Sequence, residues 1–202
     1  MLRFSGFILC LVMLACGPAS AGERIVLGGD AHMSDSSATL SEPSPRDALV
    51  SGFTIALTGK VEKDASAAGF SVDIDAPVGQ DLYAMGFSVT VAQPIGEDLT
   101  AIGSSIHVRS QASVGGNARL AAASIIVDAP VAGSLLGTAG SITLNGAVTG
   151  DARLTAGSLV FGPNAKIGGS LTYFAPEPLT IPPSVIPADR VRYEKLAPGS
   201  AM

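Results

Sequence analysis

The chain has few of the residues that usually mark an enzyme site or a disulfide framework. Its 202 residues include no tryptophan, only two histidines and only two cysteines. Charged residues make up 14% of the sequence and apolar ones 47%, which excludes a disordered polyelectrolyte. Acidic residues outnumber basic ones by 17 to 12, so nucleic-acid binding through a basic surface is not expected. These shortages favour a compact, strand-forming chain, and its 24 glycines indicate many turns.

The first 21 residues have the layout of a secretory signal peptide. Arg3 precedes an apolar run over residues 7–15, and small residues fill positions 19–21. We expect cleavage after Ala21 and export, with the periplasm as the location. The alternative is a lipoprotein signal, in which residues 14–16 act as a lipobox and a lipid-anchored Cys16 becomes the first residue.

Both cysteines, Cys10 and Cys16, lie inside this leader. A chain cut after Ala21 would contain no thiol, no disulfide and no thiolate metal ligand. It would keep 11 of the 12 basic residues against 17 acidic ones. No later stretch approaches the ~18 consecutive apolar residues of a membrane helix, so we expect no transmembrane span in the mature chain.

A short motif returns eight times along the chain. It consists of a small hydroxyl residue, an apolar residue, any residue and another apolar residue, as in Ser88-Val89-Thr90-Val91. The copies begin 17 residues apart, except for one step of 19. Their hydroxyl residues are Ser37, Thr54, Ser71, Ser88, Ser105, Ser124, Ser141 and Ser158. A fixed period of this length without a helical pattern is typical of a solenoid.

A second apolar position recurs at one phase of every copy. It is occupied by Val61, Val78, Ile95, Val114, Val131, Val148 and Ile167. Because no single copy could bury these residues, we predict an all-β fold, a single-stranded parallel β-helix of about eight coils of about 17 residues. Stacking the coils about 4.8 Å apart would place Val72, Val89 and Ile106 directly over one another.

The same period divides the chain into segments. We expect the β-helix over residues 37–174, an N-terminal cap over residues 22–36 and a proline-rich C-terminal cap or tail over residues 175–202. Two short insertions, between Val108 and Val114 and between Phe161 and Ile167, are expected to bulge from one corner of the rod.

Polar residues also recur at this period. One column, here called the acidic column, contains Asp47, Asp64, Asp81, Asp98, Asn117, Ser134, Asp151 and Ser170. We expect these side chains to cap corners, each oxygen accepting a backbone N–H in its own turn. The alternative is a ladder that collects Ca²⁺ or the basic groups of a partner. The hydroxyl column is interpreted as stacking at a corner and not as an ice-binding face, because its companion outward column is irregular.

Neither histidine lies in a pattern that supports catalysis. His32 precedes the regular coils, and His107 occupies an outward position filled by Thr90 and Ile126 in neighbouring copies. Pairs such as Ile95-Gly96 also occur in left-handed acyltransferase helices, but those enzymes use a histidine base. Helical carbonic anhydrases need three histidines for each metal ion. We therefore predict no enzyme activity and no catalytic, cofactor-binding or metal-binding residues.

The repeat resembles a known family. The motif G-x-x-x-x-A-x-G-x-S-V-x-V-x-x-x-I-G runs from Gly79 to Gly96 and resembles the bactofilins, the polymer-forming cytoskeletal proteins, over about residues 50–174. The resemblance implies a right-handed β-helix that joins end to end into nonpolar filaments and scaffolds envelope and cell-shape machinery without nucleotide. The export leader and the prolines at 176, 178, 182, 183 and 187 depart from the better-known members. Because proline cannot donate to a strand ladder, we expect this flank to cap the last coil.

We therefore expect a structural protein of the cell envelope that forms homopolymers or oligomers through the ends of its β-helix. The open coil at each end of a solenoid is a template for another copy unless it is covered. Peptidoglycan and envelope proteins are the expected further partners. The alternative function is that of a monomeric periplasmic rod that binds a glycan or an envelope protein.

Overall fold

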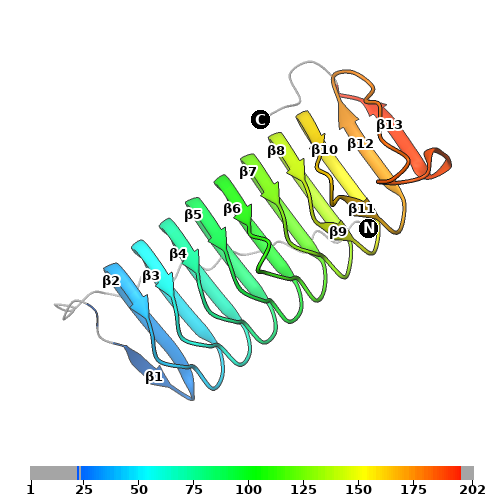
Figure 1. Cartoon of the computed structure of the whole chain (residues 1–202). Coiled ribbons are helices and arrows are strands. Elements are labelled where there is room, and N and C mark those ends of the chain that lie inside the picture. The colour runs from blue at the N-terminus through cyan, green and yellow to red at the C-terminus, as the bar shows by residue number, and fades with distance from the viewer. Residues whose placement is uncertain (1–21, 23, 197–202) are drawn as a thin grey trace, which may run out of the picture.

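The computed structural model describes residue 22 and residues 24–196. In this part of the chain the strands stack side by side into a rod (Figure 1). The leader predicted over residues 1–21, with its alternative lipid anchor at Cys16, lies outside the described residues. No helix in the described ranges is long and apolar enough to cross a membrane.

Long strands of ten or eleven residues form the body of the rod. They are β2 (Asp30–Leu40), β3 (Ala48–Leu57), β4 (Ala65–Ile74), β5 (Leu82–Val91), β6 (Leu99–Val108), β7 (Ala118–Val127), β8 (Leu135–Leu144) and β10 (Ala152–Phe161). Each pairs in parallel with the next, and β12 (Leu171–Ala175) and β13 (Val191–Lys195) continue the same sheet. The predicted all-β parallel β-helix is confirmed, and its ladder extends beyond the eight expected coils.

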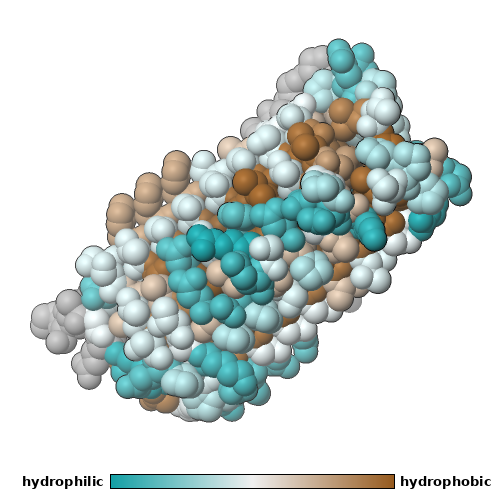
Figure 2. Space-filling view, viewed as in Figure 1, coloured by the Kyte–Doolittle hydropathy of each residue, from teal (hydrophilic) through white to brown (hydrophobic). Residues whose placement is uncertain are grey.

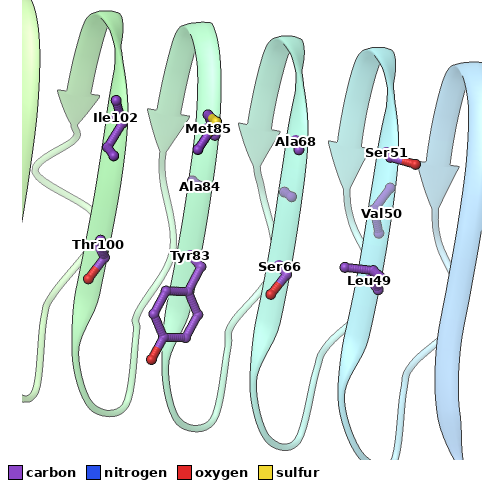
Figure 3. Close-up of a pocket in the computed structure, with 11 residues that line it drawn as sticks. Leu49, Val50, Ser51, Ser66, Ala68, Tyr83, Ala84, Met85, Thr100 and Ile102 are labelled. Atoms are coloured by element: carbon purple, nitrogen blue, oxygen red, sulfur yellow. The ribbon is translucent and has the colours of Figure 1, made fainter. Parts of the chain in front are cut away.

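The apolar residues form continuous files inside the rod. Val72 pairs with Val89, and Val89 pairs with Ile106, in the register that the 17-residue period predicts. All three are at most 1% exposed. Along β5 the burial alternates in each half of the strand but loses its phase near Gly86. There the strand bends, so that its first half lies on one face of the rod and its second half returns behind (Figure 3).

The second apolar position closes each coil. Val61, Val78, Ile95 and Val114 are linked by successive parallel bridges between neighbouring coils. Near the C-terminal end the same position falls on the short strands β9 (Ala147–Val148) and β11 (Lys166–Ile167), which also pair in parallel. These residues are buried against the long strands, so each coil encloses one shared apolar core.

Close stacking explains why the corners contain glycine. A Cβ atom on Gly96 would lie 2.0 Å from the carbonyl oxygen of Gly79 in the preceding coil, a distance that no side chain tolerates. Among the described residues, positive φ angles occur only at Gly22, Gly28 and Gly29. The last two form the turn between β1 (Ile25–Leu27) and β2.

The two insertions form turns at the rod surface, as predicted. The N–H of Ala112 donates to the carbonyl of Arg109 at 2.9 Å, and the N–H of Ala165 donates to Gly162 at 3.1 Å. The bridge from Ile95 to Val114 spans the first insertion without a break in the ladder. The extra residues therefore leave the core register unchanged.

Both flanks take part in the ladder. β1 pairs antiparallel with β2, which begins at Asp30, so the regular sheet starts inside the segment expected to form the N-terminal cap. In the proline-rich flank, Val185 and Ile186 are buried, and the carbonyl of Val185 accepts the N–H of Ile167 at 2.9 Å. A short 3-10 helix (Ala188–Arg190) leads into β13. This flank therefore covers the core and also adds a further strand.

Candidate functional site

The two histidines lie on different strands, His32 on β2 and His107 on β6. His107 pairs in register between Thr90 and Ile126, and its Nε2 lies 2.8 Å from Oδ2 of Asp128. His32 lies on β2 opposite Ile25 of β1. In the part of the chain that the structure describes, no group of three or more His, Cys, Asp or Glu side chains is placed to hold a metal ion.

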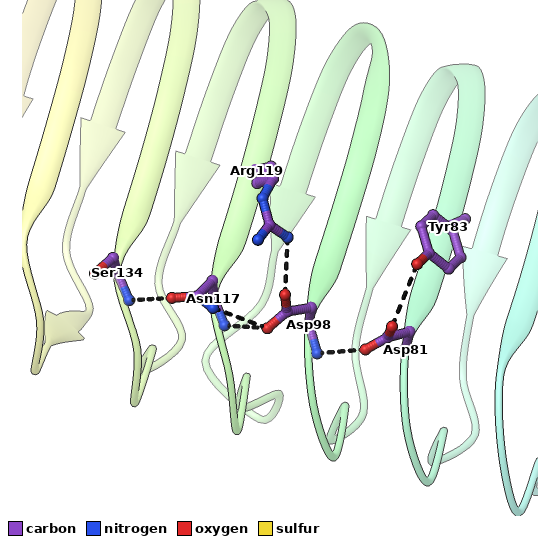
Figure 4. Close-up of polar contacts among 6 residues, drawn as sticks. All are labelled: Asp81, Tyr83, Asp98, Asn117, Arg119 and Ser134. Atoms are coloured by element: carbon purple, nitrogen blue, oxygen red, sulfur yellow. Dashed lines mark hydrogen bonds and ion pairs between the residues drawn. The ribbon is translucent and has the colours of Figure 1, made fainter. Parts of the chain in front are cut away.

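The acidic column forms a polar ladder along one corner of the rod (Figure 4). The Asp81 N–H donates to Oδ1 of Asp64 at 3.0 Å, and the Asp98 N–H donates to Oδ1 of Asp81 at 2.9 Å. The Asn117 N–H continues the ladder to Oδ1 of Asp98 at 2.7 Å. The expectation that each oxygen bonds within its own turn is wrong for these residues. Each side chain reaches the next coil instead, because parallel stacking brings that coil's backbone within hydrogen-bond range.

These hydrogen bonds compensate the repulsion between stacked carboxylates. The Asn117 N–H, followed by the side chain of Arg119, holds the pKa of Asp98 below its ordinary value of 3.8. The negative charge of Asp81 raises the pKa of Tyr83, whose hydroxyl donates to Oδ2 of Asp81 at 3.2 Å. Since the backbone occupies an oxygen of each carboxylate, the contacts explain this column as part of the fold.

A second column is aromatic and exposed. Phe53, Phe70 and Phe87 follow Gly52, Gly69 and Gly86 at constant 17-residue steps. Their rings stack with centroids 4.8 and 4.9 Å apart and are nearly parallel, yet they are 62%, 47% and 56% exposed. We call these three residues the phenylalanine column. Sequence reasoning did not identify it, although the repeated Gly-Phe pair was a visible signal.

The phenylalanine column borders an uncharged surface over β3 to β6. Figure 3 shows two rows of outward residues on these strands. The rows are Leu49, Ser66, Tyr83, Thr100 and Ser51, Ala68, Met85, Ile102. We call these two rows and the phenylalanine column together the apolar face. The small side chains of Ser66 and Ala68, between larger neighbours, leave a hollow of about 310 Å³.

Charged residues lie at the borders of the apolar face. Beyond β6, Arg119 on β7 occupies the row of Thr100, and toward the N-terminus β2 carries Asp35. The acidic column follows the border beside Tyr83. On the side of the rod that Figure 2 shows, which is not the side of Figure 3, hydrophilic and hydrophobic patches also adjoin one another. The apolar face is thus a bounded surface with a polar rim.

The two ends of the main sheet differ in chemistry. At the N-terminal end, β1 exposes Ile25, Val26 and Leu27, and its outer edge has no strand partner within the described residues. At the other end, β13 carries Arg192 and Glu194, whose Nε and Oε1 atoms lie 3.1 Å apart. Charged side chains on an edge strand oppose the pairing of another strand. The N-terminal edge is therefore the more favourable one for association.

A further edge is open on β10. β12 pairs only with residues 152–155 of this strand, and the chain then leaves the sheet at Pro176. Within the described residues, the second half of β10 pairs only with β8. The prolines of the flank that passes here cannot donate to it.

The functional proposal for this rod depends on its geometry. Comparisons of the chain with protein-family models, with curated proteins and with solved structures find no match.

Proposed function

We propose that this protein is a non-enzymatic scaffolding rod of the cell envelope, which associates with further copies of itself through the ends of its β-helix. The observation that carries the proposal is the unpaired, uncharged edge that β1 presents at one end of the sheet. The assembly would be bactofilin-like, in keeping with the family that the repeats resemble. The leader predicted over residues 1–21 would deliver the chain to the periplasm.

The physical reason is the continuity of the ladder. Inside the rod, the long strands β3 to β8 are each paired on both edges, and each coil buries the apolar file of the next. β1 has one paired edge, and its three aliphatic side chains are 52–71% exposed. Pairing with another copy would satisfy its outward N–H and C=O groups and bury these side chains, each worth roughly 1 kcal/mol from half exposure. No nucleotide or metal is required for such growth.

The alternative function is that of a monomeric rod that binds a glycan or an envelope protein. Glycans stack on the faces of aromatic rings, whereas Phe70 has both ring faces covered by its neighbours and Phe53 and Phe87 each have one face covered. The exposed aromatic surface therefore favours an apolar protein partner over a sugar.

Sedimentation and electron microscopy of the exported protein test the proposal. The protein is expected to sediment as assemblies whose size rises with concentration and that are visible as filaments. Ile25→Lys, on β1, places a charge on the edge strand and is expected to shorten or abolish the filaments. Ile126→Lys is the matched control, because Ile126 is also exposed but lies on the flank of β7. A monomer at high protein concentration in several salts would contradict the proposal, and so would filaments that are insensitive to Ile25→Lys.

A further inference from the structure

We propose that the apolar face is the contact surface for a second copy of this chain, which joins two rods side by side. This contact is distinct from the end contact proposed above, because it lies along the flank over β3 to β6 and does not involve β1. It would act whether or not the ends associate.

The size of the apolar face fits a stable pair. Its large apolar side chains are between 47% and 62% exposed, and they are Leu49, Phe53, Phe70, Tyr83, Met85, Phe87 and Ile102. A large side chain removes ~150–250 Å² from water when fully buried, so their exposed parts amount to roughly 700 Å². A standard protein interface buries about 800 Å² on each partner, whereas the largest apolar patch of a typical monomer covers about 300–600 Å².

The face also contains its own complement in shape. The phenylalanine column projects along one border, and the hollow above Ser66 and Ala68 lies within the same face. A two-fold axis brings the same surface of two copies together, so each copy can place its projection in the hollow of the other. No outward residue in the two rows or the phenylalanine column is charged, so no unpaired charge would be buried.

The borders favour a parallel pair, with the two-fold axis along the rods. This axis keeps each strand at the same level as the identical strand of the other copy. It also places the two borders of the face opposite each other, so that Phe70 of one copy lies toward the row of Ser66 in the other. It also separates the two acidic columns, because each lies beside the Tyr83 row of its own copy. An antiparallel pair would bring both acidic columns to the same border, where they would repel each other.

The rim disfavours a lipid surface as the occupant. Membrane-surface proteins surround their apolar side chains with Lys and Arg, which attract anionic headgroups. Here the acidic column, including Asp64 and Asp81, follows one border, and the chain as a whole has a formal net charge of −5. A second copy of the chain presents an uncharged surface of the same size and avoids this repulsion.

The test separates the lateral contact from the end contact by working in the Ile25→Lys variant. Sedimentation equilibrium of this variant is expected to show a dimer. Adding Met85→Lys, at the centre of the face, is expected to raise the dimer dissociation constant by at least about 100-fold, because two unpaired charges would be buried in each pair. Adding Ile126→Lys instead is expected to leave the dimer unchanged, and circular dichroism establishes that each variant is folded.

Two further measurements test the geometry. Ser104→Phe places a fourth ring next to Phe87 in the register of β6 and is expected to tighten the dimer. A spin label on Val160→Cys, outside the face on β10, distinguishes the two orientations by electron paramagnetic resonance. In a parallel pair the labels lie at the same level. An antiparallel pair would separate them by roughly 40 Å along the rod, from the spacing of the strands.

The outcomes are distinct for the two proposals. A monomer in the Ile25→Lys variant would overturn the lateral contact, and so would a dimer that is insensitive to Met85→Lys. Co-flotation with phosphatidylcholine vesicles that Met85→Lys abolishes would assign the face to a membrane and overturn it as well. A dimer that responds to Met85→Lys, together with a wild-type chain that forms no filaments, would support the lateral contact and reject the end contact alone.

Discussion

Substitutions of Asp64 can measure how much the acidic column contributes to the stability of the fold. Its Oδ1 accepts the N–H of Asp81 at 3.0 Å, and no other side chain donates to it among the described residues. Asp64→Ala removes this acceptor and leaves a partly buried N–H without a partner. Asp64→Asn keeps an oxygen at the same position, as Asn117 does naturally when it accepts the N–H of Ser134 at 3.0 Å.

Two opposing interactions determine how much each substitution changes the free energy of unfolding. A hydrogen bond to a charged group contributes ~1.5–3 kcal/mol and a neutral one ~1 kcal/mol. Carboxylates about 4.8 Å apart repel by ~0.9 kcal/mol in water, and Asp64 has the neighbours Asp47 and Asp81. Salt at about 0.1 M screens part of this repulsion, so relief amounts to roughly 1 kcal/mol. We therefore expect Asp64→Ala to lower the free energy of unfolding by about 1 kcal/mol and Asp64→Asn to change it by less than about 0.5 kcal/mol.

Salt dependence separates the two terms. At about 1 M salt the repulsion is almost fully screened, so each substitution should become more destabilising by about 1 kcal/mol relative to the unsubstituted protein. Urea denaturation followed by circular dichroism at both salt concentrations measures these differences. Equal destabilisation by Ala and Asn at low salt would refute the reasoning, because it would mean that the acceptor oxygen is not what the column contributes.

Ile106→Ala removes a fully buried side chain from the core file and should cost about 2–4 kcal/mol in urea denaturation, whereas Thr90→Ala, on the outward side, should cost less than about 0.5 kcal/mol. The lowered pKa of Asp98 means that its contribution to stability is present above the ordinary value of 3.8 and is lost as the pH falls through the folded value. Asp98→Asn should therefore flatten the acid limb of a plot of melting temperature against pH, and an unchanged acid limb would contradict the assignment. Phe70 has two stacked neighbours and Phe53 has one. In the monomeric variant that carries Ile25→Lys and Met85→Lys, Phe70→Ala should therefore lose about twice the stacking energy that Phe53→Ala loses, or roughly 2 against 1 kcal/mol. Equal losses by urea denaturation would show that the rings do not stack in solution.

The solenoid could be predicted because the sequence contains eight copies of the repeat at a nearly constant spacing. Val72, Val89 and Ile106 can be buried only against their copies in neighbouring coils, so the spacing alone determines the register. The hydrogen-bond partner of Asp64 could not be predicted in the same way. Its spacing is equally compatible with a bond to its own turn and with a bond to the next coil, and the direction of the side chain at the corner decides between them.

The phenylalanine column shows a different limit. Counting outward and inward positions forward from Leu82, which is buried, places Phe87 outside, whereas counting back from the buried Val91 places it inside. The bend near Gly86 resets the alternation, and strand periodicity does not reveal where a strand bends. The repeated Gly-Phe pair therefore indicates a column of rings, but its exposure could be recognised only once the path of the backbone was known.

The position of the apolar face links the lateral contact to growth at the ends. In a parallel pair, the β1 strands of both copies lie at the same level and face the same direction, so an end contact would join pairs of rods. Two end contacts that form together benefit from a high effective concentration, which strengthens assembly without any new contact at the ends. Met85→Lys should therefore shorten the filaments of the otherwise unsubstituted protein in electron micrographs, although Met85 on β5 is far from β1 in the ladder. In an antiparallel pair the two β1 strands lie at opposite ends of the pair, so two end contacts could not form together. Met85→Lys would then not shorten the filaments through this effect.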